Sequence, residues 1–94
     1  MSTPEVRHAP DRSRFEITID GRMVGHADYR LDDAGRWVFR HTEVDPDHQG
    51  EGLAGTLVAG ALDEVRAAGG TIVAECPYVR RFVREHPDYA DLTR

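Results

Sequence analysis

The sequence predicts one α+β domain, in which a mixed, mostly antiparallel sheet of about four strands is flanked by two helices. Two observations carry this prediction. Three segments with strand-like alternation follow one another and are separated by turn residues. An amphipathic helical pattern, a short apolar run and a second helical pattern come after them. Because a chain of 94 residues has room for only one core, all these segments belong to one domain.

The chain begins with a polar segment and then a predicted strand. Residues 1–12 are polar with two prolines, which indicates a flexible N-terminal arm and places the domain at residues 13–94. Phe15, Ile17 and Ile19 alternate with polar residues, as in a half-buried strand. Asp20-Gly21 is typical of a hairpin turn, so the next strand returns antiparallel.

Two further strands are predicted over residues 23–31 and 36–44. The turn-rich residues 32–35 separate them. Strict alternation in the second of these strands puts Trp37, Phe39, His41 and Glu43 on one face. These segments complete an antiparallel meander in the front half of the domain.

The second half of the chain has helical periodicity. Apolar residues from Leu53 to Ala68 recur at helical spacing, and Gly69-Gly70 ends that helix. Residues 71–75 then form a short buried strand. Pro77 suits the first position of a second helix, which makes Cys76 its N-cap.

Composition and charge exclude several classes of protein. The formal net charge of -5 argues against a nucleic-acid partner, because such binding needs clustered cations. All twelve cationic residues are arginine, so the chain has no lysine to acetylate. The lone Cys76, the absence of a signal-like apolar segment near Met1, and the lack of a run of about 20 apolar residues indicate a cytoplasmic protein without a membrane partner. We expect a monomer or a weak homodimer.

Residues 49–55 form a glycine-bearing loop between a strand and a helix. Free backbone N–H groups and the helix dipole favour an anionic ligand at such a place. Two alternatives stay open. Gly50 and Gly52 can simply shape a turn. Residues 50–55 also satisfy the dinucleotide pattern G-x-G-x-x-G, although three strands precede the loop and little chain remains for a parallel sheet. A triphosphate P-loop is excluded because no Gly-Lys-Ser/Thr follows.

The same loop carries a resemblance to a known family. Residues 49–54, Gln-Gly-Glu-Gly-Leu-Ala, resemble the GNAT acetyltransferase pattern Q/R-x-x-G-x-G/A. Residues 41–44, 76–79, 82–83 and 86–89, which include Cys-Pro-Tyr, are similar to a small subfamily of stand-alone GNAT-like domains. The resemblance covers residues 13–92 and implies a minimal GNAT-like fold.

This resemblance implies acetyl-coenzyme A (acetyl-CoA) as the cofactor and an N-acetyltransferase activity. The loop would cradle the pyrophosphate, and the pantetheine arm would lie between the strands at 36–44 and 71–75, held by the backbone of Glu43 and Val44. The cofactor-binding residues that we expect on this basis are Glu43, Val44, Gln49, Gly50, Glu51, Gly52, Leu53, Ala54, Gly55, Cys76, Tyr78 and Phe82.

Three residues are candidates for the chemistry, and no metal site is predicted. His41 and Glu43 lie two apart on one strand, where a base and an orienting carboxylate can cooperate; the alternative is an ordinary surface histidine. At a helix N-cap the dipole favours a thiolate, so Cys76 is a candidate nucleophile; the alternative is a buried thiol that packs as a small apolar residue.

The sequence thus leaves three functional hypotheses. The first is an acetyl-CoA-dependent N-acetyltransferase acting on an amine of unknown identity. The second is a binding module that holds coenzyme A without turnover, since the helices that wall the acceptor site in this family are missing. The third and weakest is a dinucleotide-binding domain.

Overall fold

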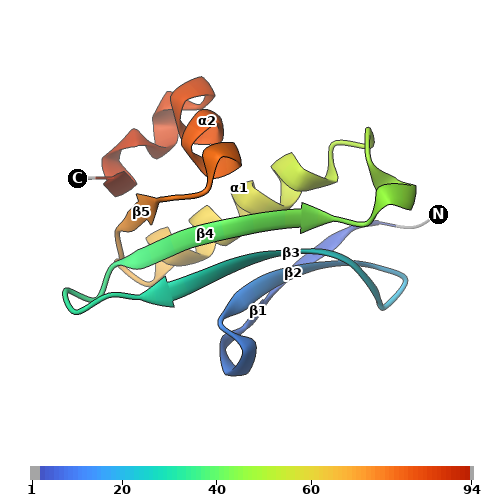
Figure 1. Cartoon of the computed structure of the whole chain (residues 1–94), viewed down its shortest axis with the longest axis horizontal. Helices are drawn as coiled ribbons and strands as arrows, with labels where there is room; N and C mark the ends of the chain where they lie inside the picture. Colours follow the sequence, from blue (N-terminus) through green and yellow to red (C-terminus); the bar gives the residue numbers. More distant parts are fainter. Residues whose placement is uncertain (1–2, 94) are drawn as a thin grey trace.

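The computed structural model describes residues 3–93, so the first two residues of the predicted arm and the last residue of the predicted domain lie outside the described residues. Five strands form one sheet in the order β1-β2-β3-β4-β5 within this range (Figure 1). The strands are β1 (Glu5–Ala9), β2 (Arg14–Ile19), β3 (Arg22–Leu31), β4 (Trp37–Val44) and β5 (Ile72–Ala74). The helices are α1 (Leu53–Ala67) and α2 (Pro77–Glu85), and short 3-10 turns cover Pro10–Arg12, Pro46–His48 and Pro87–Thr93.

The sheet is mixed and mostly antiparallel. Strands β1 to β4 pair antiparallel in sequence order, and β5 is added parallel to β4 after the α1 crossover. The predicted α+β class and the hairpin at Asp20-Gly21 are confirmed. The two helices begin and end within about one residue of the predicted positions. The strand number is five, where the sequence predicted about four.

The additional strand, β1, corrects the interpretation of residues 5–9 as part of a flexible arm. Val6 pairs with Ile17 in the register, and His8 pairs with Phe15 and stacks on its ring at 4.4 Å. Gly60 explains how the strand fits against α1, because a Cβ there would lie only 2.9 Å from the Val6 side chain. The alternation was missed because His8, a polar residue by type, occupies an apolar position.

A bulge in β4 corrects the predicted faces of that strand. Asp28 pairs with His41 and Tyr29 pairs with Phe39, so Arg40 is an extra residue. Trp37 and Phe39 therefore face the core, whereas His41 and Glu43 face the opposite side of the sheet. The prediction that all four share one face is wrong.

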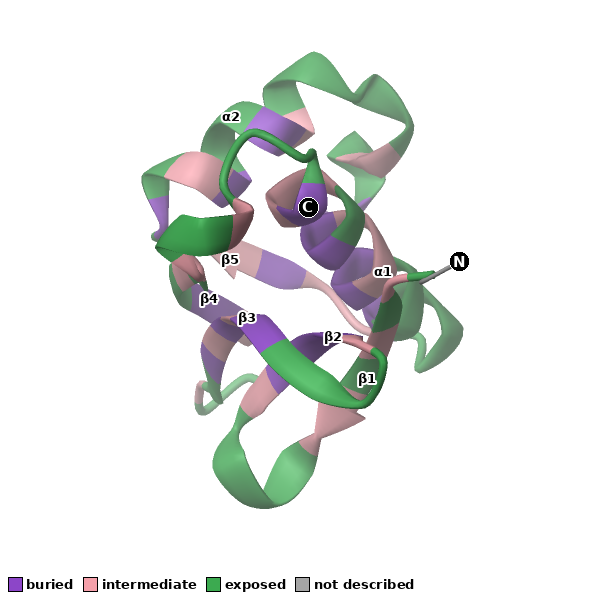
Figure 2. Ribbon diagram, turned by 90° about the vertical axis from the view of Figure 1, so that its right-hand side faces the viewer, coloured by how far each residue is buried: buried purple, intermediate pink, exposed green. Residues whose placement is uncertain are grey.

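Both helices lie on the same side of the sheet (Figure 2). One apolar cluster joins the inner faces of the strands to α1, α2 and the C-terminal turn. The buried residues of α1 are Leu53, Leu57, Val58, Ala61, Leu62 and Val65, which recur at helical spacing. The other face of the sheet, which we call the outer face, carries polar side chains from β2, β3 and β4.

The C-terminal turn is anchored to α1 by polar contacts. Arg66 Nη1 donates to Asp91 Oδ2 at 2.7 Å, and the Tyr89 hydroxyl donates to Asp63 Oδ1 at 2.8 Å. Burial, together with the bond to Asp63, raises the pKa of Tyr89 to about 12, so it remains a proton donor at neutral pH. This anchoring fixes Tyr89 beside α2, where it helps to wall the site described next.

Candidate functional site

The glycine loop ends at the N-terminus of α1 in an open conformation. Gly50 and Gly52 have φ of +86° and +77°, in the left-handed region that side chains with a Cβ rarely adopt. A Cβ at either position would meet nothing within 4 Å, so neither glycine is required by protein packing. The backbone geometry and the empty space above it are what a ligand approaching the loop needs.

The first turn of α1 leaves its backbone donors available. The first N–H that bonds back into the helix is that of Thr56, which donates to Gly52 C=O at 3.2 Å. The N–H groups of residues 53–55 precede this bond, as in any helix start. Gly52 caps the helix without a side-chain bond, and the first turn holds no acidic residue. An anion such as a pyrophosphate fits this position, because the helix dipole favours negative charge there.

A cleft of about 410 Å³ connects the loop to β4. It is lined by Thr42 and Val44 of β4, by His48 and Gln49 before the loop, and by residues of the loop and first turn, with Tyr78 of α2 closing it. Gln49 Nε2 donates to Val44 C=O at 3.3 Å, which fastens the loop to the end of β4. The cleft therefore runs from the start of α1 to the edge of the sheet.

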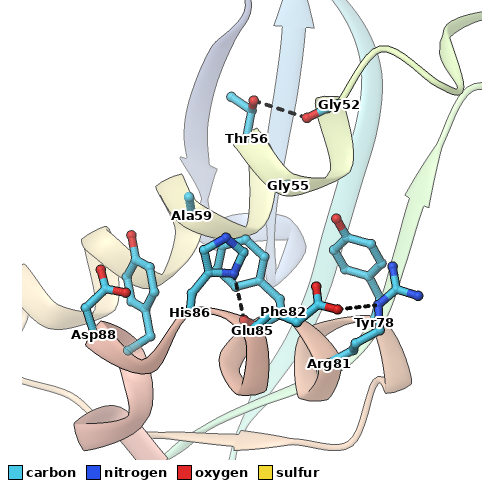
Figure 3. Close-up of a pocket in the computed structure, with 11 residues that line it drawn as sticks. Gly52, Gly55, Thr56, Ala59, Tyr78, Arg81, Phe82, Glu85, His86 and Asp88 are labelled. Carbon is cyan, nitrogen blue, oxygen red and sulfur yellow. Dashed lines mark hydrogen bonds and ion pairs between the residues drawn. The ribbon is translucent and has the colours of Figure 1, made fainter.

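A second cavity of about 450 Å³ continues the cleft between α1 and α2 and shares Gly52, Gly55 and Tyr78 with it. Tyr78, Phe82 and His86 project toward α1 across this cavity (Figure 3). Arg81 supplies a cation to its wall, with its guanidinium 5.7 Å from the centre of the Tyr78 ring. The two hollows form one groove with its donors at the start of α1.

Strands β4 and β5 separate beside this groove. They pair only over residues 37–39 and 72–74. The N–H groups of Glu75 and Cys76 then both donate to Phe39 C=O, at 3.0 and 2.8 Å, and the chain turns away into α2. On the side away from β3, the edge of β4 from residue 40 to 44 pairs with no strand among the described residues. An extended ligand chain can therefore lie along this edge.

Comparison with known proteins shows the family of this chain. Residues 14–92 match the family model described as GCN5-related N-acetyl-transferase. This chain belongs to the GNAT acetyltransferase family. No curated protein matches the chain.

Solved structures share the fold. A GCN5-like protein from Staphylococcus aureus matches at a TM-score of 0.74 with 21% identity, over 100% of this chain and 91% of that one. A GNAT-family protein from Desulfovibrio desulfuricans matches at 0.60 with 28% identity, over 77% of this chain and 52% of that one. The ribosomal-protein-alanine N-acetyltransferase from Brucella melitensis matches at 0.58 with 22% identity, over 86% and 60%. The chain thus spans only about half to three fifths of the last two.

The GNAT match and the topology leave the dinucleotide alternative without support. In a dinucleotide fold the glycine loop follows the first strand of a parallel sheet. Here the loop follows β4 of an antiparallel meander, and β4–β5 is the parallel pair.

The structure brings most of the predicted cofactor residues of this GNAT domain to the groove. Those that line it are Val44, Gln49, Gly50, Gly52, Leu53, Ala54, Gly55, Tyr78 and Phe82. Glu51, Glu43 and Cys76 do not line it. The carbonyl of Glu43 lies against β3, since a Cβ at Gly25 would be 2.8 Å from that oxygen.

Cys76 is the N-cap of α2, as predicted, but its side chain is buried. Its exposed fraction is 4%, and it belongs to the apolar core. Its Sγ lies 3.5 Å from Oγ1 of Thr42, whose side chain lines the cleft. The thiol therefore lies behind the wall of the groove, at the point where the two strands separate.

His41 and Glu43 form the predicted pair on the outer face. His41 Nε2 lies 3.1 Å from Glu43 Oε1, and both side chains are more than half exposed. The hydrogen bond from His41, reinforced by the charge of His26, holds the pKa of Glu43 below its ordinary value. Glu43 is thus a carboxylate at neutral pH that can orient an imidazole.

Several groove residues were not predicted from the sequence. Thr42, His48, Thr56, Ala59, Arg81, Glu85, His86, Asp88 and Tyr89 line it together with the predicted residues. They come from β4, α1, α2 and the C-terminal turn, and only the fold brings these elements together. The sequence did contain a weak indication for Thr42. It lies between His41 and Glu43 on a strand, so its side chain points to the opposite face of the sheet from theirs.

Proposed function

We propose that this GNAT domain is an acetyl-CoA-dependent N-acetyltransferase that moves an acetyl group to an amine. The observation that carries the proposal is the open glycine loop at the start of α1, next to the free edge of β4. The loop offers backbone donors for a pyrophosphate, and the free edge offers a place for a pantetheine chain. Left-handed glycines that face open space also occur in simple turns, as at Gly35, so the position of the loop at the start of α1 and beside the free edge of β4 is what supports the proposal.

The proposed binding role of each part follows from its position. The N–H groups of residues 53–55 hold the phosphates, and Gln49 keeps the loop against Val44. Thr42 and Tyr78 line the cleft on either side of its path toward the strand edge. Arg81 adds a cation to the wall of the second cavity, where the nucleotide end would lie.

The proposed chemistry is direct transfer. Bound acetyl-CoA supplies an acetyl thioester, whose C–S bond breaks as the acceptor nitrogen forms its C–N bond. His41 accepts one proton from the acceptor ammonium so that the nitrogen lone pair becomes available, and the second amine proton goes to the thiolate sulfur. Glu43 orients His41 and stabilises its protonated form. His41 directly precedes Thr42 of the cleft, so base and cleft lie on opposite faces of one exposed strand edge.

Cys76 is the proposed carrier in an alternative, covalent route. Its position behind Thr42 and its burial favour direct transfer instead. We expect that wild-type protein incubated with acetyl-CoA gains no acetyl group at Cys76, as measured by intact mass and peptide mapping. The chain has no lysine, so an added acetyl group can only lie on Cys76 or the N-terminus, and the Cys76→Ala variant separates these. A Cys76-bound acetyl group that then passes to an added amine would contradict direct transfer.

A coenzyme A-binding module without turnover is the second proposal. The observation that favours it is that neither His41 nor Cys76, the candidate catalytic residues, lines the groove. Single-turnover assays with saturating acetyl-CoA and a mixture of peptide and small amines separate the two proposals. Acetylated product supports the enzyme, and binding without any product supports the module.

A further inference from the structure

A small cavity lies on the outer face, where β3 begins and β4 ends. Its volume is about 270 Å³, and its lining includes the apolar residues Met23 and Pro46 and the polar residues His26, Glu43 and Asp45, whereas the side chain of Val24, which also borders it, is buried in the core. Within the described residues, Met23 and Leu31 are the large apolar side chains that remain exposed, and Met23 lies in this cavity. A ligand with one cationic and one apolar part matches such a lining.

A series of polar contacts between side chains holds Glu43 at this cavity. Asp28 Oδ1 lies 2.9 Å from His26 Nδ1, and His26 Nε2 lies 4.0 Å from Glu43 Oε2. Glu43 Oε1 in turn meets His41 at 3.1 Å. His26 is the most buried of these four, with 18% of its side chain exposed, so it fixes the position of the others. Glu43 thus lines the cavity and also meets His41, the proposed base, which itself lines a different hollow with Asp28 and Arg40.

The cationic groups beside this cavity, His26 and Arg14, are each paired with a carboxylate outside its lining, Asp28 and Glu16 respectively. Arg14 reaches Met23 Sδ at 3.5 Å, but its Nε donates to Glu16 at 2.8 Å, and Arg12 also pairs with Glu16. The second carboxylate of the cavity, Asp45, accepts the Asp47 N–H at 3.1 Å. The cavity therefore favours a cation over an anion.

The exposure of the base restricts which amine can react. Removing a proton from an ammonium is easier the closer its pKa lies to that of the base, and an α-amino group has a pKa of about 8 against about 10.4 for lysine. Burial is what lowers a lysine pKa in proteins, but His41 and Glu43 are 58% and 63% exposed. This open, carboxylate-bearing face does not lower the pKa of a lysine side chain, so a lysine there stays protonated and unreactive.

We infer that the acceptor is an α-amine next to an apolar side chain, with its ammonium group at Glu43 and its apolar part against Met23 and Pro46. This rests on the proposed N-acetyltransferase function and names its substrate class. Two sources share this chemistry, the N-terminus of a peptide and a free amino-acid amide. Both satisfy the cavity, and the experiment distinguishes them.

The first test is binding without acetyl-CoA, so that it does not depend on turnover. The backbone and side-chain signals of Met23, Val24, His26 and Glu43 are expected to shift in NMR spectra when Leu-Gly-Gly amide is added, and to stay unchanged with its Nα-acetylated form. Met23→Glu should abolish the shifts at the other three residues, whereas Leu31→Glu, which places the same charge at the far end of β3, should preserve them. Equal shifts with the acetylated peptide, or shifts at other residues only, would overturn the inference.

The second test is competition between amines for acetyl transfer. Full-length protein and acetyl-CoA are given Leu-Gly-Gly amide, leucine amide and Nα-acetyl-Lys-Gly-Gly amide in equal amounts. We expect the two α-amines to be acetylated at least about tenfold faster than the lysine side chain. The ratio of the first two products tells a peptide N-terminus from a small amine. Faster acetylation of lysine would overturn the inference and leave the proposed function intact, whereas loss of acetyl-CoA binding would contradict the proposed function itself.

Discussion

Substituting Gly52 by aspartate is expected to weaken acetyl-CoA binding by at least about 100-fold, or about 2.7 kcal/mol. Gly52 caps α1 and lies where the phosphates are proposed to bind. A carboxylate there repels them, and one pair of like charges about 4 Å apart costs about 1–4 kcal/mol at the dielectric constants of water and of protein surfaces. Isothermal titration of the variant with acetyl-CoA measures the loss.

The matched control is Gly35→Asp. Gly35 has the same φ of +77°, and a Cβ there also meets nothing within 4 Å, but it lies in the β3–β4 turn at the opposite end of β4 (Figure 1). The two variants therefore share the backbone strain and the added charge. We expect Gly35→Asp to bind acetyl-CoA as the wild type does. Equal losses in both would show that strain, and not repulsion of a phosphate, accounts for the effect.

Substituting His41 by alanine is expected to lower kcat/KM for acetyl transfer by about 10²–10⁴-fold, the usual contribution of a placed general base. The dissociation constant for acetyl-CoA should change by less than about twofold, because His41 lies on the outer face and does not line the groove. Steady-state rates and titration with acetyl-CoA, measured on the same protein, separate the two quantities.

The His41→Gln variant keeps an amide that can donate to Glu43 but cannot accept a proton. We expect it to be as slow as His41→Ala and to lose one ionisation from the pH profile of kcat/KM. If glutamine restores the rate, His41 acts by holding Glu43 in place and is not the base. The assignment of proton transfer to His41 would then be wrong.

Local sequence signals predicted much of the fold because they act over a few residues. Asp20-Gly21 forms the expected turn, with both residues at positive φ, and Gly69 ends α1 at φ +72°. The apolar positions of α1 face the core as their spacing predicts. Each of these features depends on neighbours along the chain, so one sequence is sufficient to find it.

Features that depend on distant contacts were missed. The β4 bulge at Arg40 falls where the strand changes from apolar to polar residues, so alternation after it no longer reports which face is buried. Strand β1 was hidden by polar residues, although Gly60 gave a signal. A glycine in the middle of a helix costs about 1 kcal/mol relative to alanine, which indicates a close neighbour, here Val6.

The candidate site shows the same division. The residues of the glycine loop follow one another in the chain, so their pattern was readable, and they line the groove. Thr42 and His48 reach the groove through the separation of β4 from β5 and through the turn after β4, which no local pattern specifies. The burial of Cys76 likewise follows from packing in the core and not from its position at a helix cap.

Isothermal titration of the wild-type protein with acetyl-CoA, coenzyme A and NAD in parallel tests the central claim most directly. The account predicts that both coenzyme A species bind with a dissociation constant below about 100 μM, corresponding to more than about 5 kcal/mol, and that NAD gives no heat. Absence of binding by both coenzyme A species, or binding of NAD in their place, would contradict it.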